Sequence, residues 1–137
     1  MSGRQYYRPI EMLLALMTLS IGVAILSPVI TVSESAYAPI GRFLGETGTG
    51  TVCLAVGSGW VMALIINGRW RHSPDLRGFC AVAAATLYAG FAAATIHTFL
   101  QSGVMRGFGI FFALDTVALC LACAWQSGRE ARRAVSD

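Results

Sequence analysis

The sequence predicts an all-α membrane protein in which four transmembrane helices form one antiparallel bundle, with both termini in the cytoplasm. The chain has 137 residues, of which 55% are hydrophobic and only 12% are charged. A soluble domain of this size needs a polar surface, and so few charged residues cannot cover it. We therefore expect residues 1–137 to form a single integral membrane domain with the bilayer as its solvent.

Four stretches are long and apolar enough to be membrane spans: residues 12–32, 51–67, 79–99 and 107–126. A helix needs about 20 residues to cross a hydrocarbon core of about 30 Å. The second stretch is the shortest, and residues 43–50 can extend it if Glu46 lies at the interface. The first stretch has an alternative reading as a cleaved signal peptide, but its length and Pro39 after Ala36-Tyr37-Ala38 favour a retained helix.

The distribution of arginine predicts the orientation, because all ten basic residues are arginine. Eight of them lie on the side of the termini and the central connection, whereas only Arg42 and Arg106 lie in the first and third connections. Short loops rich in Lys or Arg face the cytoplasm. We therefore expect a multi-pass protein of a bacterial inner membrane. Its cytoplasmic loop and tail contain Arg69, Arg71, Arg77, Arg129, Arg132 and Arg133 and contact anionic lipid headgroups.

The connections contain two helix-start signals. Ser73-Pro74 suits the beginning of the third helix, with Ser73 as the cap and Pro74 in the first position. In the first connection, Pro39 suits a short interfacial helix, and an irregular loop with the glycine-rich residues 45–50 is the alternative.

Asp115 is the most informative single residue, because it lies well inside the fourth span. A carboxylate there costs about 2.5–3.5 kcal/mol on insertion scales, so it normally faces protein or water and has a partner. Tyr88 and Thr86 match its depth better than His97, which is expected near the outer interface. Asp115 could line an ion path, join two copies, or bond to a neighbouring helix.

Small residues at helical spacing indicate close helix packing. The third span carries Ala81, Ala85, Ala89 and Ala93 at intervals of four, and the second span carries Ala55, Gly59 and Ala63. Such residues let helix backbones approach closely in lipid. Packing within the bundle and self-association between copies are both open.

We expect no enzyme activity and no cofactor, because no nucleophile, base and orienting group occur together. The four cysteines lie in apolar segments and are expected to pack as small hydrophobic residues, including the Cys120 and Cys123 pair. No second ligand pair with suitable spacing accompanies them, so no metal site is expected. A net charge of +3 without a basic aromatic face argues against nucleic acid as a partner.

The central loop, residues 67–77, lies between apolar helices and is followed by a last span with Asp115 and an arginine-rich tail. This arrangement resembles small membrane proteins encoded by phages and prophages, over roughly residues 64–133. Some of these are holin-like, and the resemblance implies a protein that oligomerises in the inner membrane and permeabilises it. The chain differs from common holin classes in having four spans rather than one to three.

Two other functions fit the same features. A non-permeabilising accessory or superinfection-exclusion subunit would dock onto a larger membrane complex. A small proton- or ion-coupled carrier would use Asp115, although the two halves of the chain show no inverted repeat.

Overall fold

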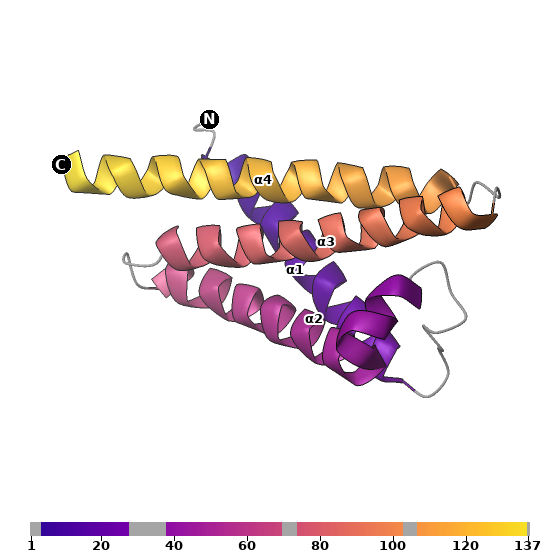
Figure 1. Ribbon diagram of the computed structural model, residues 1–137. Helices are drawn as coiled ribbons and strands as arrows, with labels where there is room; N and C mark the ends of the chain where they lie inside the picture. Colours follow the sequence, from indigo (N-terminus) through magenta and orange to yellow (C-terminus); the bar gives the residue numbers. More distant parts are fainter. Residues whose placement is uncertain (1–3, 28–37, 70–73, 103–106, 137) are drawn as a thin grey trace.

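The computed structural model describes residues 4–27, 38–69, 74–102 and 107–136. They form four α-helices, α1 (Arg4–Leu26), α2 (Ala38–Arg69), α3 (Pro74–Ser102) and α4 (Gly107–Ser136) (Figure 1), and contain no β-strand. Each helix contains a segment long and apolar enough to cross a membrane: Arg8–Leu26, Leu44–Ile66, Asp75–Ser102 and Gly109–Arg132. The predicted class, an all-helical chain with four potential membrane spans, is confirmed.

The first and second spans have boundaries that differ from those predicted from the sequence. Helix α1 ends at Leu26, and the amide of Ser27 donates to the carbonyl oxygens of Val23 and Ala24. The remainder of the first predicted span, residues 28–32, lies outside the described residues. The second span does extend backwards to Leu44 and includes Glu46, as the short apolar stretch required.

Helix α2 is kinked at Gly45, which has φ 71° and ψ 162°. A residue without a Cβ adopts a positive φ without steric strain, so glycine can redirect the chain here. The kink separates a short helix, residues 38–44, from the long one that follows. The predicted short helix in the first connection is therefore observed, and the alternative of a glycine-rich irregular loop at residues 45–50 is wrong.

The bundle consists of two helical hairpins. Helix α1 packs extensively on α2, and α3 packs extensively on α4, whereas α2 and α3 join the hairpins and α1 meets α4 only briefly. Figure 1 shows α3 and α4 side by side along their length and α1 crossing obliquely. The first hairpin is held close by glycines: a Cβ on Gly57 would lie 2.6 Å from the backbone nitrogen of Leu19, and one on Gly22 would lie 2.7 Å from that of Leu54.

The alanine ladder of α3 does not serve one interface. Ala81 and Ala85 are buried in the bundle, whereas Ala89 and Ala93 are exposed. An α-helix has 3.6 residues per turn, so positions four apart rotate by about 40° at each step. Residues at the far end of the ladder have therefore turned away from the core.

The small residues of α2 also divide. Ala63 is buried, and Gly59 faces Cys80, whose sulfur would lie 4.0 Å from an added Cβ. Ala55 is exposed. Thus two of the three predicted packing positions in α2 contribute to the bundle.

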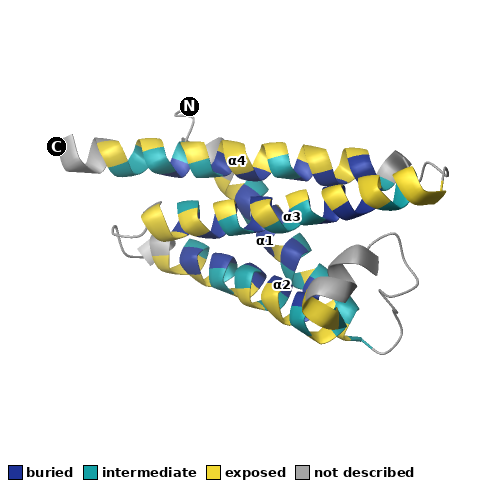
Figure 2. Ribbon diagram, in the orientation of Figure 1, coloured by how far each residue is buried: buried dark blue, intermediate teal, exposed yellow. Residues whose placement is uncertain are grey.

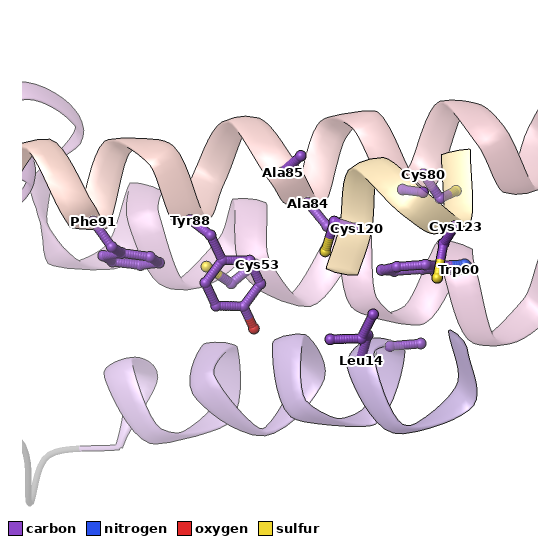
Figure 3. Close-up of a cluster of buried hydrophobic side chains, with 12 residues drawn as sticks. Leu14, Cys53, Trp60, Cys80, Ala84, Ala85, Tyr88, Phe91, Cys120 and Cys123 are labelled. Atoms are coloured by element: carbon purple, nitrogen blue, oxygen red, sulfur yellow. The ribbon is translucent and has the colours of Figure 1, made fainter. Parts of the chain in front are cut away.

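The core contains all four cysteines, which are free and buried, as their apolar surroundings predicted. They lie around Trp60, Leu14 and Tyr88, with small alanines between them (Figure 3). Short side chains let the helices approach, and the large rings of Trp60 and Tyr88 fill the remaining space. The core therefore joins residues from all four helices.

Candidate functional site

Three charged side chains meet at one end of the bundle, near the start of α1, the start of α3 and the end of α4. The Nε of Arg77 donates to Oε2 of Glu11 at 2.9 Å, and its Nη2 donates to Oε1 of Glu11 at 2.6 Å. Its Nη1 donates to Oε2 of Glu130 at 3.2 Å. The guanidinium thus binds Glu11 side-on with two hydrogen bonds and holds Glu130 with a third. We call these three residues the charge cluster.

The charge cluster is largely removed from solvent. The side chains of Arg77 and Glu11 are 2% and 1% exposed, and that of Glu130 is 21% exposed. A buried charge is tolerated when it is paired and its hydrogen-bonding groups are satisfied. The planar guanidinium meets this requirement because two of its edges match two carboxylates.

Arg77 therefore corrects one sequence-based expectation. The sequence predicts that Arg77 belongs to the basic loop that contacts lipid headgroups, but the structure places it between carboxylates on two other helices. The signal was present in the sequence: an antiparallel four-helix bundle puts the start of α1, the start of α3 and the end of α4 at the same end. Glu11 and Glu130 lie at these places, so both acids were available to Arg77.

Two further polar groups are buried without a hydrogen-bond partner among the described residues, Nε1 of Trp60 and Oγ of Ser127. Ser127 lies one turn before Glu130 on α4. It packs opposite Gly78, where an added Cβ would lie 3.6 Å from its own Cβ. The buried hydroxyl of Ser127 therefore adds a polar group one turn from Glu130 of the charge cluster.

Tyr88 has a partner different from the one expected. Its hydroxyl lies 3.2 Å from Oγ1 of Thr18 on α1, and that oxygen also donates to the carbonyl of Leu14 at 2.8 Å. Thr86 is exposed and donates to the carbonyl of Val82 on its own helix. Neither residue contacts Asp115, and the expected bond between Asp115 and Tyr88 or Thr86 is not formed.

Asp115 instead faces away from the bundle. It is exposed on α4, and its carboxylate makes no hydrogen bond or ion pair with the described residues. His97 is also exposed, and its Nε2 lies 3.5 Å from Nε2 of Gln101 on the same helix. A single copy of the chain therefore presents a carboxylate on the outside of a membrane-spanning helix, which is where lipid would contact it.

The arginines of the tail differ from Arg77. Arg129 and Arg132 are exposed, and Arg132 lies over the ring of Trp125 at 6.0 Å from its centroid. This pairing suits a membrane boundary, where an aromatic ring and a cation are both favoured. Arg71 lies outside the described residues, as do the side chains of Arg69 and Arg133.

The described residues thus belong to a small helical membrane protein with four helices long enough to span a bilayer. Its distinguishing features are a buried charge cluster and an outward-facing carboxylate. Comparison with protein-family models, curated proteins and solved structures finds no match.

Proposed function

We propose that the protein inserts in a bacterial inner membrane, assembles from several copies and permeabilises the membrane, as holin-like phage proteins do. The observation that carries this proposal is the exposed position of Asp115 on α4. In one copy this carboxylate faces lipid, which is unfavourable. Assembly would let several copies turn it towards each other or towards a water-filled lesion.

The same observation separates the proposal from the carrier hypothesis. A carrier within one bundle needs its ionisable group to face a path between the helices. Asp115 is exposed on the outside, and the buried charged groups are paired with one another. The carrier hypothesis thus has no support from the position of this residue.

The proposed orientation places the charge cluster, both termini and the connection between α2 and α3 on the cytoplasmic side. This orientation follows from the excess of arginine in the two terminal segments and in the connection between α2 and α3, because arginine-rich short loops face the cytoplasm. The exposed arginines of α4 would then contact the anionic headgroups of the inner leaflet.

Inducible expression in bacteria with a membrane-potential dye tests the proposal. We expect the dye signal and growth to collapse after induction of the parent chain, and Asp115→Leu to prevent the collapse at equal membrane yield. Asp75→Leu is the matched control, because Asp75 is an exposed aspartate at the end of a span rather than within it.

An undisturbed potential at high expression of the parent would refute permeabilisation. If the chain then co-purified with one defined host or phage membrane protein, the accessory-subunit hypothesis would replace the permeabilisation hypothesis.

A further inference from the structure

The two hairpins of the bundle are joined more firmly on one side than on the other. Helices α2 and α3 pack against each other between the hairpins, whereas α1 and α4 meet only briefly. We call the line along which α1 and α4 meet the α1–α4 seam. At one end of this seam, Arg77 on α3 binds Glu11 on α1 and Glu130 on α4. The charge cluster therefore closes a side of the bundle that helix packing leaves weak.

Two buried polar atoms near the charge cluster have no hydrogen-bond partner among the described residues, Nε1 of Trp60 and Oγ of Ser127. Ser127 lies at the same end of α4 as the charge cluster. The nitrogen of the Trp60 ring is on the side away from Tyr88 (Figure 3), and thus towards the end of α3 that carries Arg77. An N–H or O–H group buried without a partner is costly. Water is a partner that both atoms can use.

The charge cluster contains one more carboxylate than its pairing requires. Glu11 and Glu130 supply two negative charges for the single positive charge of Arg77, so the ionised cluster has a net charge of −1. The carboxylates repel each other, and an excess charge in a buried site favours contact with water. Arg77 and Glu130 belong to the same hairpin, so they stay paired if Glu11 moves away with α1. The cluster thus allows a closed arrangement with both carboxylates bound and an open one in which Glu11 is released.

We infer that the α1–α4 seam opens at the charge cluster and admits water to the interior of the bundle, and that the contact between Arg77 and Glu11 is the latch that closes it. In the open arrangement, water hydrates the released Glu11 carboxylate and reaches the two unpartnered atoms. Opening ends at Thr18 and Tyr88, whose hydroxyl oxygens lie 3.2 Å apart and join α1 to α3 further along the bundle. The latch belongs to a single copy of the chain and does not depend on the proposed assembly or permeabilisation.

The buried native cysteines report on this opening. Cys123 lies one turn from Ser127, on the side of α4 that faces the bundle, where the buried residues of this helix gather (Figure 2). Cys53 lies beside Tyr88, at the far limit of the opening (Figure 3). We would treat membranes that contain the chain with a small, charged, water-soluble methanethiosulfonate reagent and measure the labelling rate of each cysteine by mass spectrometry. A buried thiol reacts through local opening, so the rate at Cys123 follows the population of the open arrangement.

Glu11→Gln removes the charge that Arg77 binds across the seam. It should raise the labelling rate of Cys123 by about tenfold or more, which corresponds to about 1.4 kcal/mol of opening free energy, and leave Cys53 at its parent rate. Glu130→Gln is the matched control, because it removes the same charge from within one hairpin and leaves the latch in place. It should hold the Cys123 rate at or below that of the parent, since Arg77 loses its partner in the open arrangement and Glu11 loses a like charge nearby.

A faster Cys123 reaction confined to Glu11→Gln supports the latch. Equal acceleration of Cys53 and Cys123 in this variant indicates general unfolding and overturns it. An unchanged Cys123 rate in Glu11→Gln, or a rise of the same size in Glu130→Gln, overturns it as well. Membrane potential is not part of this measurement. Failure of permeabilisation therefore leaves the latch standing, and failure of the latch leaves permeabilisation standing.

Discussion

Arg77 binds Glu11 side-on through two hydrogen bonds of 2.9 and 2.6 Å, and this contact joins the two helical hairpins of the bundle. Thr18 and Tyr88 form a second polar contact between the same two helices, α1 and α3. Because the interface between hairpins is less extensive than the packing within each hairpin, we expect these contacts to determine how firmly the hairpins are held together.

Replacement of Arg77 by Gln should destabilise the bundle more than any other single change at this end. It leaves the buried Glu11 without its counter-charge, and removal of one partner of a buried ion pair costs about 3–5 kcal/mol. Arg77→Lys should fall between Gln and the parent, because an ammonium keeps the charge but loses the side-on geometry. The free energy of unfolding, measured by SDS titration in mixed micelles with circular dichroism, provides the test. A parent-like transition for Arg77→Gln would contradict the role of the cluster.

Glu11 and Glu130 should respond differently to the same substitution. Glu11→Gln removes the buried, doubly bonded partner of Arg77, whereas Glu130→Gln weakens a single bond of 3.2 Å at a side chain that is 21% exposed. Water partly solvates the Glu130 carboxylate, so losing its single bond leaves less uncompensated charge than losing Glu11 does. We therefore expect Glu11→Gln to lower the unfolding free energy clearly and Glu130→Gln to lower it by a smaller amount. Equal losses in the two variants would be inconsistent with the asymmetry of the cluster.

Tyr88→Phe should cause a small loss confined to the hairpin contact. The substitution keeps the ring in the core and removes only the hydroxyl that lies 3.2 Å from Thr18. Net hydrogen bonds contribute about 0.5–1.5 kcal/mol, and interhelical ones in membranes average about 0.6 kcal/mol. Thr86→Val is the control, since the Thr86 hydroxyl bonds only within its own helix. A larger loss for Thr86→Val than for Tyr88→Phe would show that the interhelical bond is not the relevant one.

Gly57→Ala should separate α1 from α2. The added methyl group would lie 2.6 Å from the backbone nitrogen of Leu19, so the helices must move apart. Gly128→Ala is the matched control, because nothing lies within 4 Å of an added Cβ there. Removing a helical glycine stabilises by about 0.5–1 kcal/mol where there is room. We expect thermal stability in detergent, followed by size-exclusion chromatography, to fall for Gly57→Ala and to hold or rise for Gly128→Ala. A stable Gly57→Ala variant would contradict the close packing of the first hairpin.

The helical spans and the partners of their polar residues differ in how far sequence alone can predict them. The span of residues 79–99 was identified because hydrocarbon requires a continuous apolar stretch, which is a local property of the chain. Even the extension of α2 back to Leu44 followed from the length needed to cross the bilayer. The role of Arg77 cannot be predicted in this way, because its partners lie 66 and 53 residues away in the sequence. Counting arginines along the sequence shows only that Arg77 lies near the connection between two spans, and it does not reveal the carboxylates that Arg77 contacts.

Asp115 shows the same division most clearly. By itself, the sequence determined that this carboxylate lies within a span, since depth depends only on distance along a helix. Which way it faces was decided by the tertiary structure. In a soluble helix, the polar face reveals which side is buried. In a membrane helix, both the core side and the lipid side are apolar, so the pattern carries little information about rotation around the helix axis. Only the packing of α4 on α3 turned Ala113, Thr116 and Cys120 inward and left Asp115 outside.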